Sequence, residues 1–448
     1  MTLAHLLFAA SLTSTPSAPS ATPEIPSTRF TLDNGLQVIV HEDHRLPVIA
    51  VDLWVHVGAG DEVKGKTGFA HLFEHMMFQG SKNVPEDKHF DILRQAGASS
   101  MNGTTNFDRT NYFEVVPTNH IETALWLESD RLGLLLDHVN EASLKTQIEV
   151  VRNERRQRYD NVPYGAARFA LFAAAYPEGH PYRYLVIGKH EDLEGASLED
   201  VKEFFRTWYA PSNATLTLAG DIDVARAKEL VSKWFGSLPA IKRPPHHEPP
   251  MPALSRSERQ ELKDPFAKLT RLQLAWHAPK RFAADDADLM TLCDVLGAEG
   301  WGRLYKLLVV DKQLAQSVAV YQEPMGFSSL FNIAVTLKPG AQVKEVEALL
   351  RQEMLRMLDV GPSDSEVRRS IIDTETGLLF GLDEILGRAE QLQTFNHYTG
   401  DPGYLATHLQ EVRSRTPQTV RQAARRWLAK PRVEIVTTPA PAATGGAR

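Results

Sequence analysis

The sequence predicts an α+β fold made of two similar domains, each a mostly antiparallel sheet with helices packed on it. Short stretches of alternating apolar residues, typical of strands, are interspersed with longer stretches of helical periodicity. These stretches follow one another in a similar order in the two halves of the chain. Between the halves, residues 238–262 contain six prolines and many charges, a composition typical of a linker.

The linker divides the chain into a predicted first domain, residues 27–237, and a predicted second domain, residues 263–440. Residues 1–26 hold a short apolar run and a segment rich in Ser, Thr and Pro. They resemble a secretory signal peptide and a disordered mature N-terminus, although no Lys or Arg precedes Arg29. We therefore expect export to the periplasm, with a merely disordered N-terminus as the alternative. Residues 441–448 are predicted to be a disordered tail.

The first half begins with a predicted hairpin over residues 29–44, because two strand-like runs flank an Asp-Asn-Gly turn. Residues 67–80 switch to helical periodicity and end at Gly80, a typical helix terminator. Further strands are predicted at residues 48–60, 102–117 and 214–221, and helices at 120–136, 142–160 and 224–239. In the second half, strands are predicted at 268–279, 317–324, 330–339 and 432–439, and helices at 286–297, 303–310 and beyond residue 339. The repeated order indicates a duplicated α+β unit.

The composition argues against several classes of protein. The net charge of −7 leaves no basic field for nucleic acid. No segment reaches the ~20 apolar residues that a membrane-spanning helix needs. The single cysteine, Cys293, excludes an internal disulfide and a multi-cysteine metal site, and its apolar neighbours predict a buried position.

The strongest chemical signal is the sequence His-Leu-Phe-Glu-His at residues 71–75. Residues four apart lie on one face of a helix, so His71 and His75 can bind one tetrahedral Zn²⁺. Glu74 projects near the same face and can accept a proton from water at the metal. The alternative is a chance pattern in which both histidines are hydrogen-bonded core residues.

A catalytic zinc site needs a third protein ligand, and residues 142–160 offer two candidates, Glu149 and Glu154. Glu154 lies three residues after Val151 and seven after Gln147, on the predicted inward side of this helix. The spacing favours Glu154 mildly over Glu149. The alternative is a solvated, arginine-rich helix without a metal.

Several segments together resemble the pitrilysin/insulinase family of zinc peptidases, which carry an inverted zinc motif. The matching segments are residues 32–40, 68–81, 102–116, 150–160, 208–223 and 233–239. The resemblance extends over most of the chain. It is greatest to the short, two-domain subgroup that includes the mitochondrial processing peptidase.

The resemblance implies one Zn²⁺ per chain and assigns roles to individual residues. It implies His71, His75 and Glu154 as ligands, and so selects Glu154 over Glu149, with Glu74 as general base. It also implies an edge strand that holds a peptide substrate, with Asn102, Gly103, Thr104 and Asn106 as contacts. This chain would form one of two half-shells that close a peptidase chamber.

Two positions depart from the family pattern. Gln147 stands where a second carboxylate is usual, and it can still act as a hydrogen-bonding residue behind a metal ligand. Val309 and Gln316 stand where active members carry an Arg and a Tyr that bind the substrate carbonyl. We therefore expect a heterodimer with a paralogous subunit that supplies this pair. A homodimer could instead use donors such as Arg109 or Tyr112.

The predicted function is that of a zinc metalloendopeptidase, acting as the metal-bearing subunit of a two-subunit chamber and cleaving peptides or unfolded polypeptide segments. One alternative is a non-catalytic scaffold subunit of the same family. Another is a protein that binds zinc or captures peptides without turnover. Metal content combined with a peptide-cleavage assay separates these possibilities.

Overall fold

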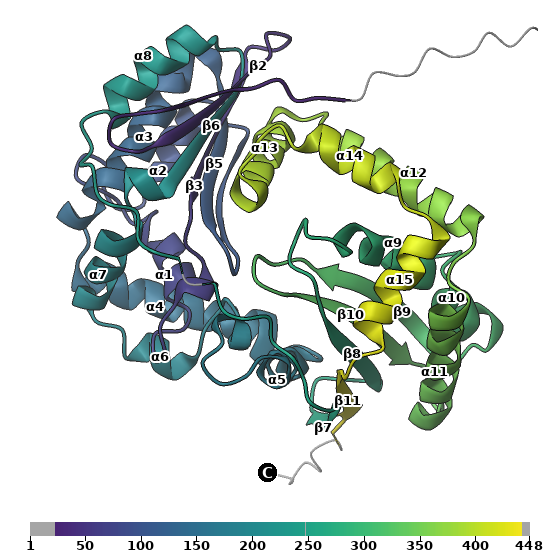
Figure 1. Ribbon diagram of the computed structural model, residues 1–448. Helices are drawn as coiled ribbons and strands as arrows, with labels where there is room; N and C mark the ends of the chain where they lie inside the picture. Colours follow the sequence, from purple (N-terminus) through teal and green to yellow (C-terminus); the bar gives the residue numbers. More distant parts are fainter. Residues whose placement is uncertain (1–22, 247, 441–448) are drawn as a thin grey trace, which may run out of the picture.

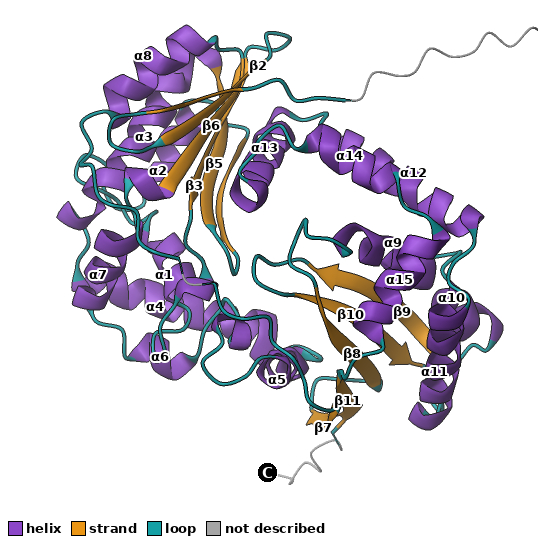
Figure 2. Cartoon of the chain, viewed as in Figure 1, coloured by secondary structure: helices purple, strands orange, loops and turns teal. Residues whose placement is uncertain are grey.

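The structure is a computed structural model that describes residues 23–246 and 248–440. Its two β-sheets lie in separate lobes, each with helices packed around it (Figure 1). Figure 2 shows that each lobe contains both a β-sheet and helices. The predicted α+β class with two sheets is confirmed.

The first sheet has six strands in the order β1-β2-β6-β3-β5-β4. Only β2 and β6 pair in parallel, and all other neighbours are antiparallel. The strands are β1 (Thr28–Thr31), β2 (Gln37–Glu42), β3 (Val48–Val55), β4 (Ser100–Thr105), β5 (Thr110–Pro117) and β6 (Ala214–Gly220). The hairpin predicted over residues 29–44 is confirmed as β1 and β2. Strand β4 lies at an edge of the sheet.

The single strand predicted over residues 102–117 is wrong, because these residues contribute to two antiparallel strands, β4 and β5. The turn between them is set by Asn106, whose Oδ1 accepts hydrogen bonds from the backbone N–H groups of Asp108 at 2.7 Å and Arg109 at 2.9 Å. An asparagine side chain can replace a backbone partner in a turn in this way.

The second sheet repeats five strands of the first. Its order is β7-β11-β8-β10-β9, with β7 and β11 parallel and the other pairs antiparallel. Strand for strand, this is the order of β2-β6-β3-β5-β4, which supports the predicted duplication. The strands are β7 (Glu258–Asp264), β8 (Arg271–Ala278), β9 (Ala315–Glu323), β10 (Ser329–Leu337) and β11 (Val433–Pro439). Residues 258–262 of the predicted linker thus already belong to a strand.

The helices of the first half are α1 (Phe69–Met76), α2 (His89–Gln95), α3 (Ile121–Leu134), α4 (Glu141–Arg155), α5 (Gly165–Ala175), α6 (His190–Glu194), α7 (Leu198–Trp208) and α8 (Val224–Phe235). Those of the second half are α9 (Asp286–Gly297), α10 (Arg303–Tyr305), α11 (Val343–Asp359), α12 (Asp364–Gly381), α13 (Ile385–Thr399), α14 (Leu405–Arg413) and α15 (Pro417–Leu428). Two π-helical turns, Arg156–Asp160 and Lys306–Asp311, directly follow α4 and α10. Cys293 on α9 is buried and forms no disulfide, so its predicted burial is confirmed.

One helix from each half of the chain packs on the sheet of the other half. Helix α13 packs on the first sheet, where the Gln393 Nε2 donates to the backbone oxygens of Asp52 at 3.0 Å and Thr215 at 2.8 Å. Helix α5 packs on the second sheet, and the carbonyl of Ala175 at its end lies 2.9 Å from His277 Nε2. This exchange ties the lobes together.

A buried carboxylate, Asp108, also joins the lobes. It lies in the β4–β5 turn and accepts a hydrogen bond from the Tyr182 hydroxyl of the first half. Its Oδ2 accepts bonds from the Gly326 backbone N–H at 3.0 Å and the Tyr398 hydroxyl at 2.8 Å, both in the second half. The tip of the hairpin that carries the edge strand β4 is thereby fixed to the second lobe.

Parts of the predicted termini and linker lie outside the described residues. Residues 1–22 of the predicted signal peptide, His247 and the predicted tail are among them. Linker residue His246 is held against the first lobe, with its Nδ1 3.1 Å from Asp61 Oδ1. None of the helices in the described part of the chain combines the length and apolar character needed to cross a membrane.

Candidate metal centre

Helix α1 presents His71, Glu74 and His75, and its start is fixed by specific contacts. The residue before it, Gly68, has a φ of +87° and lies so close to Gly188 that an added Cβ would come within 2.9 Å of the Gly188 Cα. The Glu62 carboxylate accepts hydrogen bonds from the backbone N–H groups of Gly68 at 2.9 Å and Ala70 at 2.8 Å. These two bonds give partners to backbone N–H groups that have none within the first turn of a helix.

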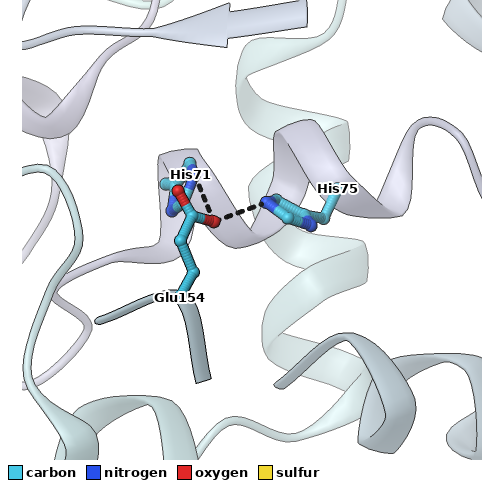
Figure 3. A group of neighbouring side chains, drawn as sticks. All are labelled: His71, His75 and Glu154. Carbon is cyan, nitrogen blue, oxygen red and sulfur yellow. Dashed lines mark ion pairs between the residues drawn. The ribbon is translucent and has the colours of Figure 1, made fainter. Parts of the chain in front are cut away.

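The structure brings His71, His75 and Glu154 together, although α1 and α4 are far apart in sequence. One potential ligand atom from each lies within 4.8 Å of the others. Glu154 Oε2 is 3.6 Å from His71 Nε2 and 3.4 Å from His75 Nε2 (Figure 3). Ligand bonds of about 2.0–2.1 Å in a tetrahedron separate neighbouring ligand atoms by roughly 3.4 Å. The three side chains therefore fit a zinc ion.

Their protonation states also suit a metal. Burial, assisted by the neighbouring His75, lowers the pKa of His71 to about 4, so its imidazole is neutral at neutral pH. Burial acts to raise the pKa of Glu154, but the close contact with His75, the neighbouring His71 and the positive charge of Arg158 outweigh it, and the net pKa is lowered. A neutral imidazole and an ionised carboxylate are the forms that bind metal.

Gln147 and Glu149 of α4 have different surroundings, and only Gln147 contacts a candidate metal ligand. Gln147 is buried, and its Oε1 is 3.3 Å from His75 Nδ1. An amide oxygen accepts, so this contact places the proton of His75 on Nδ1 and leaves Nε2 facing Glu154. Glu149 instead pairs with Arg152 at 2.5 Å, with about half of its side chain exposed.

Glu74 lies next to the three candidate ligands and faces the edge strand. Its Oε2 accepts a hydrogen bond from the Thr105 hydroxyl at 2.6 Å. Burial raises the pKa of Glu74 and outweighs this bond and the neighbouring His75, which lower it. A carboxylate with a raised pKa is well suited to accept and release a proton near neutral pH.

The candidate centre opens into a cavity of about 670 Å³. All four predicted substrate contacts line it, together with Thr105: Asn102, Gly103, Thr104 and Asn106. Gly103 permits a close approach of β4 to α1, because a Cβ there would lie 3.0 Å from Phe78 Cε2 and 3.2 Å from Glu74 Cγ.

Arg109 and Tyr112, which the sequence offered as alternative hydrogen-bond donors to the substrate carbonyl, do not line the cavity. The Tyr112 side chain is fully buried and its hydroxyl pairs with that of Tyr209 at 2.8 Å. Arg109 donates from Nη1 to the carbonyl oxygen of Thr104 at 2.9 Å, lies over the Trp54 ring and is not among the described residues that line the cavity. Neither Val309 nor Gln316 is among the described residues that line the cavity.

The sequence analysis missed three residues of this region: Thr105, Glu62 and Arg158. Strand alternation could have found Thr105, because it lies two residues after Gly103 and thus on the same side of β4. Arg158 stands four residues after Glu154, the usual spacing of an ion pair on a helix, and could have been found from that spacing. Glu62 carries no such signal, since it acts across a loop. Arg158 reaches Glu154 through the π-helical turn after α4, with its Nη1 2.8 Å from Glu154 Oε1.

Family models cover most of the chain. Residues 37–179 match the model described as insulinase (peptidase family M16), and residues 195–372 match that described as the peptidase M16 inactive domain. The zinc protease PqqE of Helicobacter pylori is 31% identical over 332 residues, covering 72% of this chain and 73% of that protein. The mitochondrial-processing peptidase subunit beta of Blastocladiella emersonii is 24% identical over 395 residues, covering 85% and 81%.

Solved structures share the fold. The crystal structure of a protease from Helicobacter pylori has a TM-score of 0.87 at 25% identity and covers 93% of this chain and 100% of that one. The periplasmic protease PqqL from Escherichia coli has a TM-score of 0.77 at 16% identity and covers 92% of this chain. The aligned part is 48% of the PqqL chain, so this chain corresponds in fold to about half of that structure.

Proposed function

This chain belongs to the insulinase family of peptidases, peptidase family M16, and from that premise we propose that it is a zinc metalloendopeptidase that cleaves peptides or unfolded polypeptide segments. The observation that carries the proposal is the convergence of His71, His75 and Glu154 within 4.8 Å beside Glu74. A non-catalytic scaffold would not require a buried carboxylate next to three metal-binding groups.

In this proposal, His71, His75 and Glu154 hold one Zn²⁺. A bound zinc ion would supply a Lewis acid that activates water and polarises a carbonyl group. Glu74 accepts the proton of the attacking water and returns it to the leaving amine. The Thr105 hydroxyl, 2.6 Å from Glu74 Oε2, keeps the carboxylate turned toward the cavity.

The peptide would bind as an additional strand along β4. Only one side of β4 is paired, with β5, and the other borders the cavity. Main-chain hydrogen bonds along β4, from Asn102 to Thr105, would hold an extended segment of any sequence, as in other cases of β-strand addition. Extended, unfolded segments are therefore the proposed substrates.

We further propose that the active form is a heterodimer in which a paralogous subunit supplies an Arg and a Tyr to the substrate carbonyl. Support comes from the residues at the corresponding positions of this chain, Val309 and Gln316, and from the PqqL structure, in which the aligned fold occupies half of a longer chain. The name of that relative, together with the apolar N-terminal run, favours a periplasmic location.

The test measures zinc content and peptide hydrolysis on the same preparation. We expect one zinc per chain, weak hydrolysis of an unfolded peptide pool by the purified chain, and a large increase with a paralogue that carries the Arg and Tyr. One missing oxyanion donor costs about 10²–10³ in rate. Full activity without the partner would exclude the heterodimer, and zinc binding without hydrolysis in either condition would exclude the peptidase.

A further inference from the structure

One charged side chain of the cavity, Arg158, has no part in the proposed chemistry. It lies in the π-helical turn Arg156–Asp160, which begins two residues after Glu154. Single π-helical turns occur frequently at functional sites. The turn places the Arg158 Nη1 2.8 Å from Glu154 Oε1, whereas Oε2 of the same carboxylate makes the contacts with His71 and His75. Arg158 is thereby anchored next to the candidate metal centre through one oxygen of Glu154.

Arg158 keeps most of its hydrogen-bonding capacity. Its side chain is 71% exposed and lines the cavity. A guanidinium group has several N–H donors, and the described contacts engage it through Nη1 with Glu154. Arg158 lines the same cavity as the strand β4 along which a peptide would bind, so its remaining donors are available there.

The other charged groups of the cavity wall already have partners. Arg168 pairs with Glu323 at 2.6 Å, and Glu74 is bound by Thr105. With a divalent cation at the three ligands, the charge left uncompensated at this wall is positive. An anionic group of the substrate would meet a favourable potential here, and a cationic group an unfavourable one.

We propose that Arg158 is a specificity-determining residue that binds a carboxylate of the peptide substrate near the cleaved bond. Arginine binds carboxylates through paired N–H donors, with a geometry that an amide cannot match. The carboxylate belongs either to an Asp or Glu side chain or to the C-terminus of the peptide. The inference rests on the proposed peptidase function, because it requires a peptide in the cavity.

The experiment uses peptides that differ only in carrying Glu or Gln, scanned through the positions that flank the cleaved bond, each with a free or an amidated C-terminus. Hydrolysis is measured for the zinc-loaded enzyme and for its Arg158→Gln variant. Arg156→Gln is the matched control, since Arg156 lies in the same turn, is not part of the cavity wall and donates to Asn153 at 2.5 Å. Binding is measured separately on zinc-loaded enzyme carrying Glu74→Gln.

We expect kcat/KM for the Glu peptide to exceed that for the Gln peptide by roughly fivefold at one position, as for a partly exposed charge pair. Arg158→Gln should bring this ratio near one, whereas Arg156→Gln should preserve it, with zinc content unchanged in both. If faster hydrolysis depends on a free C-terminus and not on the Glu side chain, the C-terminal carboxylate is the group that Arg158 binds. An equal loss on both peptides, or an unchanged ratio in Arg158→Gln, overturns the proposal.

The binding measurement separates this inference from the proposed function. If the Glu74→Gln enzyme binds the Glu peptide more tightly and Arg158→Gln removes the difference, Arg158 has the proposed role even if hydrolysis is undetectable. If peptides are cleaved but bind without regard to charge, the peptidase stands and the role of Arg158 is refuted.

Discussion

Replacing Glu74 by glutamine tests the proposed chemistry while leaving the site intact. Glutamine has the same shape, and its side-chain oxygen can accept the hydrogen bond that Thr105 now donates to Glu74 Oε2 at 2.6 Å. The three candidate metal ligands are untouched. Burial disfavours an ionised carboxylate at this position, as the raised pKa of Glu74 indicates, so a neutral side chain should not weaken the fold.

The expected loss of activity follows from the role of a general base. Such a group contributes about 10²–10⁴-fold to the rate, which corresponds to roughly 3–5 kcal/mol of transition-state stabilisation. The loss should appear mainly in kcat, because Glu74 acts on water and the leaving amine, while a peptide bound along β4 keeps its main-chain hydrogen bonds. Zinc content should equal that of the wild type.

The assay combines elemental analysis with steady-state hydrolysis of an unfolded peptide pool, in the presence of the partner subunit if one is needed. Glu149→Gln is the matched control, because it makes the same change on a half-exposed carboxylate of α4 that pairs with Arg152. Near-normal turnover in Glu74→Gln would refute the assignment of the base. Loss of zinc in this variant would mean that Glu74 helps to hold the metal.

The remaining predictions concern the metal, the edge strand and the contact between the lobes. Glu154→Ala should abolish zinc binding, measured by elemental analysis after dialysis. Gln147→Leu should weaken zinc affinity by about 10–100-fold in a chelator competition, since residues behind metal ligands have effects of this size. Gly103→Ala should retain zinc but lower kcat/KM, because the new methyl group would press on Glu74. Asp108→Asn should lower the free energy of unfolding by about 1–3 kcal/mol, measured by denaturant unfolding, because an amide has one oxygen in place of two and would leave a donor at this site without a partner.

These results would be contradicted in distinct ways. Zinc retained in Glu154→Ala, together with loss of zinc in Glu149→Ala, would move the third ligand to Glu149. Unchanged zinc affinity in Gln147→Leu would show that its contact with His75 has no influence on the metal. An Asp108→Asn protein as stable as the wild type would show that the hydrogen bonds from Tyr182, Gly326 and Tyr398 do not limit stability.

Features that depend on local periodicity could be predicted from the amino-acid sequence alone. Most strands, several helices and the duplicated order could be predicted because alternation and helical spacing repeat over a few residues, whereas the division of residues 100–117 into two strands could not. The His-x-x-Glu-His motif is also local, since its spacing alone places His71 and His75 on one helix face. For the third ligand, spacing favoured Glu154 only mildly, and the family resemblance was needed to choose it.

The tertiary structure decided what depends on contacts between distant segments. Only packing places α4 against α1, exchanges α5 and α13 between the lobes, and buries Tyr112 out of reach of the cavity. No periodic pattern encodes such contacts, because each depends on the shape and charge of a partner far away in the sequence.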